Sequence, residues 1–235
     1  MNKRIGVFDS GIGGTTTLEE IRKILPNEDY IFIGDSKNNP YGNKSDEELL
    51  NITSEIVDSL ISKDVKLIVI ACNTATTKCI EKLRLKYPNM IFVGTEPAIK
   101  VACDNNYKNT LVLATPGTIS SKRTHDLIDN NKKDFENIYL IALDGLANAI
   151  ERKDTKEIDE ILDKYLIPYQ NKKIDAIVLG CTHYPLIKNR IQKYFKDSII
   201  IDGNKGVARR VKQQLEVNNL LNDKGTSQVE YIFTK

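Results

Sequence analysis

The segment LIVIACNT (residues 67–74) recurs later in the chain as AIVLGCTH (residues 176–183). Each copy is a run of apolar residues, β-branched at its centre, that ends in a cysteine followed by polar residues. Runs of this kind are typical of strands in a parallel sheet that is covered on both faces. The pattern therefore predicts two buried strands, with Cys72 and Cys181 just beyond their carboxyl ends.

A second pair of segments repeats at a matching distance from these cysteines. RIGVFDSGIGG (residues 4–14) and TLVLATPGT (residues 110–118) each look like a strand that runs into a Ser/Thr/Gly turn. Asp9 precedes Cys72 by 63 residues, and Thr115 precedes Cys181 by 66. The spacing predicts two similar, pseudo-symmetric halves. Because ligands of open α/β sheets bind at the carboxyl ends of the strands, we expect a site in the cleft between the halves, with one sulfur on each side.

Amphipathic stretches alternate with the apolar runs. Leu49, Ile56 and Leu60 follow helical spacing behind SDEE (residues 45–48), a capping-box sequence. Alternating strands and helices predict an α/β fold, with two similar domains and mainly parallel sheets. The expected strands include residues 5–8, 30–33, 67–71, 91–93, 111–114, 138–141, 176–179, 199–201 and 229–233.

Composition and charge argue against several classes of protein. The 235 residues carry 34 Lys plus Arg and 32 Asp plus Glu, a net charge of +2, which provides no broad field for nucleic acid or an anionic membrane. No apolar run approaches the ~20 residues of a membrane span, and the start lacks a signal-peptide core. We therefore expect a cytoplasmic protein. Four cysteines and two histidines, without C-x-x-C spacing, predict neither a disulfide scaffold nor a metal site.

Two thiols on opposite sides of one small molecule suit inversion at a carbon acid. One thiolate removes a proton from one face while the other thiol delivers a proton to the opposite face. A helix N-terminus lowers a cysteine pKa, and we expect both Cys72 and Cys181 to lie where a strand gives way to a helix. Neutral donors for a carboxylate lie beside the cysteines and on the opposing turns: Ser10, Asn73, Thr74, Thr115, Thr118, Thr182 and His183.

At these residues the sequence resembles glutamate racemase, of the cofactor-independent aspartate/glutamate racemase superfamily. Six motifs occur in family order between residue 6 and about residue 202, so the resemblance covers most of the chain. They are GVFDSGIGG (6–14), GD with PYG (34–35 and 40–42), ACNTA (71–75), EPA (96–98), ATPGT (114–118) and LGCTHYPL (179–186).

The resemblance implies a role for each matching residue. Cys72 and Cys181 would be the acid/base pair, with Cys72 deprotonating D-glutamate and Cys181 L-glutamate. Asp9 and His183 would assist proton transfer, and Glu151 would be the additional acidic residue on the Cys181 side. The amino acid would be held by Asp9, Ser10, Tyr41, Gly42, Asn73, Thr74, Thr115, Thr118, Thr182 and His183.

The resemblance also implies an organisation and a role in the cell. Residues 1–94 plus 206–235 would form one domain and residues 95–205 the other. Family members need neither pyridoxal phosphate nor metal, and their D-glutamate is destined for peptidoglycan. A homodimer is left open. The chain departs from the family pattern at Thr15-Thr16-Thr17, Thr95, His125 and Asp202-Gly203 and in a short C-terminal tail, which leaves the substrate preference open.

Other interpretations compete with these. A nucleotide-binding fingerprint from Gly11 would need glycine where Thr16 stands. The chain could also be a racemase for aspartate or another amino acid, or an amino-acid-binding module whose cysteines are inert. We expect Cys79 and Cys103 to be core residues and His125 to lie on the surface. Lys205, Arg209, Arg210 and Lys212 are expected to form a solvated helix face.

Overall fold

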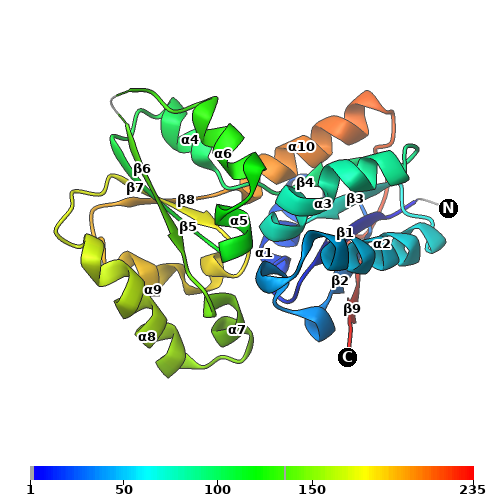
Figure 1. Cartoon of the computed structure of the whole chain (residues 1–235). Helices are drawn as coiled ribbons and strands as arrows, with labels where there is room; N and C mark the ends of the chain where they lie inside the picture. Colours follow the sequence, from blue (N-terminus) through cyan, green and yellow to red (C-terminus); the bar gives the residue numbers. More distant parts are fainter. Residues whose placement is uncertain (1–2, 135) are drawn as a thin grey trace.

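The computed structural model describes residues 3–134 and 136–235 and contains two parallel β-sheets, one in each half of the molecule (Figure 1). The first sheet has the order β4-β3-β1-β2-β9 and the second has the order β6-β5-β7-β8. The strands are β1 (Ile5–Asp9), β2 (Tyr30–Gly34), β3 (Leu67–Ile70), β4 (Phe92–Gly94), β5 (Asn109–Ala114), β6 (Asn137–Ala142), β7 (Ala176–Gly180), β8 (Ile199–Asp202) and β9 (Val229–Phe233). All neighbouring strands pair in parallel. The predicted α/β class with parallel sheets is therefore confirmed.

The sequence repeat corresponds to a repeat of topology. Strands β1 to β4 lie in the order β4-β3-β1-β2, and strands β5 to β8 lie in the equivalent order β8-β7-β5-β6. The cysteine-bearing strands β3 and β7 occupy the same position, each beside the first strand of its half. Strand β9 has no counterpart in the second sheet and adds to the edge beside β2.

Helices cover both faces of each sheet (Figure 1). They are α1 (Thr15–Ile24), α2 (Asp46–Ser62), α3 (Asn73–Lys86), α4 (Ile99–Asp104), α5 (Pro116–Ile119), α6 (Lys122–Asp129), α7 (Leu146–Glu151), α8 (Thr155–Leu166), α9 (Lys188–Gln192) and α10 (Asn204–Val217). Short 3₁₀ helices are η1 (Ser36–Asn38), η2 (Tyr41–Asn43), η3 (Ile167–Tyr169) and η4 (Tyr184–Ile187). No helix in the described ranges is long and apolar enough to cross a membrane.

Helix α2 begins where its sequence signal predicts. The Ser45 hydroxyl accepts a hydrogen bond from the Glu48 backbone N–H at 3.1 Å, which satisfies one of the free donors of the first turn. Leu49, Ile56 and Leu60 are buried against the first sheet together with residues of α3. Helix α3 begins directly after Cys72, so this packing holds the Cys72 loop on the sheet.

The C-terminal helix returns to the first half of the molecule. Val207, Val211 and Leu215 of α10 pack with Leu18 and Ile21 of α1 on one face of the first sheet. In the second half, helices α7 to α9 cover one face of the second sheet and α4 covers the other. Each half thus has its own apolar core, and the chain crosses between the halves after β4 and again after β8.

Candidate active site

Both predicted cysteines lie at the carboxyl ends of their sheets and line one cavity. Cys72 follows β3 and caps the N-terminus of the 14-residue helix α3. Cys181 follows β7, but it is succeeded by only the four-residue 3₁₀ helix η4. The expectation that each cysteine lies where a strand gives way to a helix therefore holds fully for Cys72, whereas Cys181 is separated by two residues from a 3₁₀ helix and α9 begins only at Lys188. The cavity has a volume of about 20 Å³, room for roughly one water molecule.

The cavity collects most of the predicted substrate-binding residues. Those that line it are Ser10, Tyr41, Gly42, Cys72, Asn73, Thr74, Thr115, Cys181, Thr182 and His183. Thr118, Asp9 and Glu151 stand behind this lining and bond to members of it. Three further lining residues, Asn39, Pro40 and Ala147, were not singled out from the sequence. Pro40 is the first residue of the motif at residues 40–42 and Asn39 directly precedes it, so this motif could have indicated both, whereas Ala147 carries no such signal.

A chain of polar contacts leads away from Cys181. His183 Nδ1 lies 3.8 Å from the Cys181 sulfur, and His183 Nε2 lies 2.5 Å from Glu151 Oε1. The same carboxylate oxygen accepts a hydrogen bond from the Ile12 N–H at 2.7 Å, across the cleft in the first half. Glu151 therefore connects the base of one half to the glycine turn of the other.

The protonation of this chain follows from its partners. Burial lowers the pKa of His183, but its hydrogen bonds to Cys181 and Glu151 outweigh burial and raise the pKa to about 10. Burial raises the pKa of Glu151, but the hydrogen bond and charge of His183 bring it below its usual value. At neutral pH the pair is an imidazolium and a carboxylate. The imidazolium stabilises negative charge that develops on the Cys181 sulfur.

The surroundings of Cys72 are different. Burial raises the pKa of Cys72 well above its ordinary value, and the nearby Asp9 raises it further. Hydrogen bonds from the Ala75 N–H and the Ser10 side chain act in the opposite direction without compensating. The expected lowering of this pKa by the helix N-terminus is therefore wrong here, because loss of solvent outweighs the helix N–H groups.

Asp9 joins the two halves through hydrogen bonds to a residue of each. Its carboxylate accepts hydrogen bonds from the Gly14 N–H at 2.8 Å and from the Thr182 hydroxyl at 3.1 Å. Burial raises the pKa of Asp9, although the His183 charge and these hydrogen bonds oppose the shift. Asp9 thus contacts the loop that carries Cys181 while its charge acts on Cys72.

Three threonine hydroxyls form hydrogen bonds across the boundary between the halves. The Thr74 hydroxyl lies 2.8 Å from that of Thr115 and 3.2 Å from that of Thr118. Thr115 also caps α5 through the Thr118 N–H at 3.3 Å. Beside them, the side-chain oxygens of Asn39 and Asn73 are buried without a hydrogen-bond partner among the described residues. The cavity therefore offers two free acceptors to a ligand that carries a donor.

The turn after β1 lies against the backbone of the Cys181 loop. A Cβ atom at Gly13 would lie 2.7 Å from the His183 nitrogen and 2.8 Å from the Thr182 carbonyl carbon. Real Cβ atoms do not approach backbone so closely. Position 13 is therefore occupied by glycine because the halves meet there without space for a side chain.

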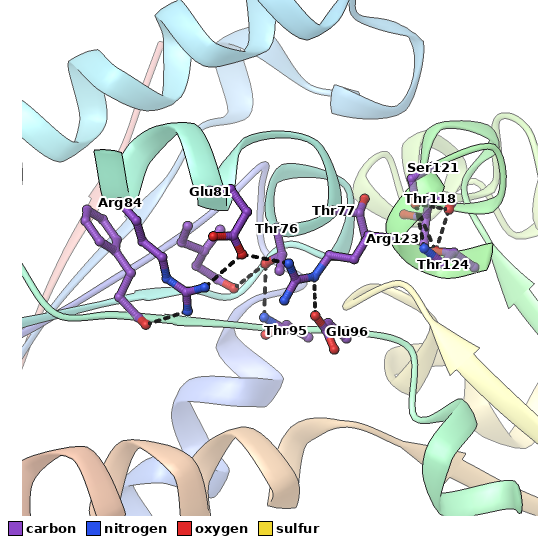
Figure 2. Close-up of polar contacts among 12 residues, drawn as sticks. Thr76, Thr77, Glu81, Arg84, Thr95, Glu96, Thr118, Ser121, Arg123 and Thr124 are labelled. Atoms are coloured by element: carbon purple, nitrogen blue, oxygen red, sulfur yellow. Dashed lines mark hydrogen bonds and ion pairs between the residues drawn. The ribbon is translucent and has the colours of Figure 1, made fainter. Parts of the chain in front are cut away.

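Polar contacts also join the halves away from the cavity (Figure 2). Arg123 of α6 forms an ion pair with Glu81 of α3 at 2.8 Å and another with Glu96, on the segment that enters the second half. Thr76 of α3 accepts a hydrogen bond from the Thr95 N–H at 3.0 Å. Helix α3, which starts at the Cys72 loop, is thereby tied to the crossover and to α6.

The residues expected to lie outside the site do so. Cys79 and Cys103 are buried in apolar clusters. His125 is exposed, as are Lys205, Arg209, Arg210 and Lys212 on α10. No group of three or more His, Cys, Asp or Glu side chains placed to hold a metal ion occurs within residues 3–134 and 136–235.

Comparison with known proteins agrees with this geometry. The model of the Asp/Glu/hydantoin racemase family matches residues 9–211. A glutamate racemase of Clostridium botulinum is 42% identical over 225 residues, 94% of this chain and 87% of the relative. A glutamate racemase of Clostridium novyi is 43% identical over 232 residues, 96% of this chain and 89% of the relative.

The fold is shared as well as the sequence. The crystal structure of a glutamate racemase from Francisella tularensis in complex with D-glutamate superimposes with a TM-score of 0.85 at 32% identity, covering 100% of this chain and 89% of the other. The family match includes both cysteines and strands β2 to β8. The chain belongs to the Asp/Glu/hydantoin racemase family.

Proposed function

We propose that this protein is a cofactor-independent glutamate racemase that interconverts L- and D-glutamate. The observation that carries the proposal is the position of Cys72 and Cys181, at equivalent strand ends of two repeated halves and on the lining of one cavity. Relatives 42% and 43% identical to the chain are glutamate racemases, and a solved relative is a complex with D-glutamate.

The proposed reaction is a transfer of two protons at one carbon. The thiolate on one side removes the Cα proton of glutamate, and the thiol on the other side delivers a proton to the opposite face. The sulfur that gained a proton and the sulfur that lost one have then exchanged states. Hydrogen-bond donors around the substrate carboxylate stabilise the negative charge that develops between the two steps.

The two cysteines have different starting roles in the proposed reaction. Cys181 faces the imidazolium of His183, which would stabilise negative charge on its sulfur, and the family resemblance assigns it the Cα proton of L-glutamate. Cys72, whose pKa burial raises, starts as the thiol and donates to the opposite face. In the reverse direction Cys72 deprotonates D-glutamate, and Asp9 is the nearby group proposed to assist it.

The lining residues supply the proposed contacts to the amino acid. The free oxygens of Asn39 and Asn73 suit an ammonium group, which has only donors to offer. The proposed holders of the carboxylates and the backbone are Ser10, Tyr41, Gly42, Thr74, Thr115, Thr118, Thr182 and His183. Because the cavity holds about 20 Å³, the halves must separate to admit glutamate and then close around it.

The domain division at residues 1–94 plus 206–235 and residues 95–205 is part of the proposal. It is supported by the packing of α10 on α1 in the core of the first half. We also propose that the protein works in the cytoplasm, where its four free cysteines stay reduced, and that its D-glutamate supplies peptidoglycan synthesis.

The deciding experiment is proton NMR of the purified protein in D₂O, with L-glutamate and then D-glutamate and no added cofactor. The expected result is loss of the Cα proton signal together with decay of optical rotation. Aspartate in place of glutamate tests the other substrate named by the family. A folded, reduced protein that exchanges neither amino acid would refute the proposal and leave an amino-acid-binding module as the better interpretation.

A further inference from the structure

Asp35, directly after β2, is a buried carboxylate for which the cysteine mechanism has no use. It is 1% exposed, and no lysine or arginine within residues 3–134 and 136–235 forms an ion pair with it. A buried charge is costly unless hydrogen bonds satisfy it. The side chains that satisfy Asp35 therefore indicate what it holds in place.

Three side chains donate to this carboxylate, two from the segment that follows β2 and one from the C-terminal residues. The Tyr41 hydroxyl donates to Oδ2 at 2.7 Å, and the Asn38 amide donates to the same oxygen at 2.9 Å. The Thr234 hydroxyl donates to Oδ1 at 2.6 Å. Asp35 thus connects the segment at residues 38–41, which contributes Tyr41 to the cavity, with the C-terminal residues that follow β9.

Tyr41 and Gly42 are the part of this network that reaches the cavity. Tyr41 is 1% exposed, and both residues line the cavity with Cys72. The turn at residues 40–42 also meets the second half, because a Cβ atom at Gly117 of α5 would lie 2.8 Å from the Gly42 carbonyl oxygen. Any rotation of Tyr41 would therefore move a wall of the cavity and a contact between the halves.

Thr234 is held by hydrogen bonds of both its side chain and its backbone. Its hydroxyl accepts a hydrogen bond from the Lys37 N–H at 3.0 Å while donating to Asp35. Its own N–H donates to the Gly34 carbonyl at 3.1 Å, continuing the parallel pairing of β9 with β2. The C-terminal strand is thereby connected to the Tyr41 turn through one carboxylate.

We propose that Asp35 is a positioning residue that sets the Tyr41–Gly42 wall of the substrate cavity, and that Thr234 of the C-terminal strand completes this network. The inference rests on the proposed function and extends it, since it assigns part of the substrate affinity to a strand that has no counterpart in the other half. Neither Asp35 nor Thr234 lines the cavity, so both act through Tyr41.

The test compares Thr234→Val with Thr226→Val. Thr226 also donates its hydroxyl to an aspartate, Asp29, at 3.2 Å and belongs to the same C-terminal segment, but it lies before β9, at the end of the sheet away from the cavity. Both substitutions remove a threonine–aspartate hydrogen bond from the C-terminal segment, a shorter and partly buried one at Thr234 and an exposed one at Thr226. Only Thr234→Val is expected to raise KM and the calorimetric Kd for D-glutamate, by about tenfold, with a smaller change in kcat.

Two further variants separate positioning from general stability. Thr234→Ser keeps the hydroxyl and should restore KM. Tyr41→Phe and Thr234→Val should be non-additive when combined, because both act through the same carboxylate. An unchanged KM and Kd in Thr234→Val, or the same loss in Thr226→Val, would overturn the inference. Lack of glutamate turnover in the unaltered protein would instead overturn the proposed function, and the Kd comparison would still report on the cavity wall.

Discussion

The Cys72 edge and the Cys181 edge have the same backbone plan and opposite electrostatics. Each cysteine follows a strand that pairs with the first strand of its half. Cys181 faces His183, which Glu151 keeps protonated, whereas Cys72 faces the negative charge of Asp9 in a dry setting. The difference teaches that the repeat places two sulfurs at equivalent positions, while the neighbouring side chains give them opposite surroundings, an imidazolium beside Cys181 and a carboxylate near Cys72.

The largest effect is expected when either sulfur is removed. Cys72→Ala and Cys181→Ala should each lower kcat by about 10²–10⁴-fold, the usual contribution of a positioned acid or base. Residual Cα exchange in D₂O should persist mainly for D-glutamate in Cys181→Ala and mainly for L-glutamate in Cys72→Ala. Polarimetry and NMR measure both quantities. Cys79→Ala, in the buried part of α3, is the matched control that should retain turnover; full activity in both site variants would contradict the two-thiol scheme.

A smaller effect is expected from removing the imidazolium. A hydrogen bond to a charged group is worth about 1.5–3 kcal/mol, so His183→Asn should lower kcat/KM by about 10–150-fold. Because racemisation has an equilibrium constant of one, the loss must be equal in both directions. The asymmetry should instead appear as a larger isotope effect for Cα-deuterated L-glutamate than for the D-enantiomer.

His125→Asn, at an exposed histidine, is the control for this substitution. Equal isotope effects for the two enantiomers in His183→Asn would show that His183 does not serve the Cys181 side in particular.

The same residue predicts a pH dependence of stability. The pKa of His183 is about 10 in the folded protein against an ordinary 6.5, so the folded state binds the proton more tightly. Its contribution to the free energy of unfolding is complete below pH 6.5 and is lost as the pH rises toward 10. Urea unfolding between pH 6.5 and 8.5 should show a decline that is weaker in His183→Asn. A slope unaffected by the substitution would assign the decline to other groups.

The smallest effect concerns the contact that joins the halves away from both sulfurs. Arg123 and Glu81 are partly exposed, and such pairs contribute about 0–1 kcal/mol, so Arg123→Gln should change KM by no more than about fivefold. High salt should reduce the difference from the unaltered protein.

Lys122→Gln is the matched control, because Lys122 pairs with Asp126 inside α6 and not across the halves. If both variants behave alike, the Arg123 ion pairs do not affect closure of the cleft.

Local sequence patterns were sufficient to predict the strands and the positions of Cys72 and Cys181. Apolar runs such as residues 67–70 are typical of covered strands, and the Ser45 cap is a short-range signal. The two cysteines follow because strand ends in parallel sheets share one edge. The pairing of β9 with β2 and the reach of Glu151 to the Ile12 N–H depend on contacts between residues distant in the chain, which no local pattern encodes.

The protonation of Cys72 shows a different limit. Its place at the start of α3 was predictable, and by itself a helix N-terminus favours a thiolate. The opposite shift arises from burial and from Asp9, and burial is known only once both halves are in place. Asp35 belongs to the motif at residues 34–35 but was given no role for a related reason: an acidic residue after a strand has no visible role until Tyr41 and Thr234 are found beside it.

The contact at Gly13 makes the closed arrangement sensitive to a single methyl group. The methyl group of an alanine at this position would collide with the His183 ring and with the backbone of Thr182 and His183, so the loop that carries Cys181 would have to move. Thr182 and His183 belong to neither apolar core, so we expect the substitution to leave both cores intact and to favour a conformation in which the two halves are further apart. A single added carbon atom is thus expected to give a stably folded protein whose cleft does not close on the substrate.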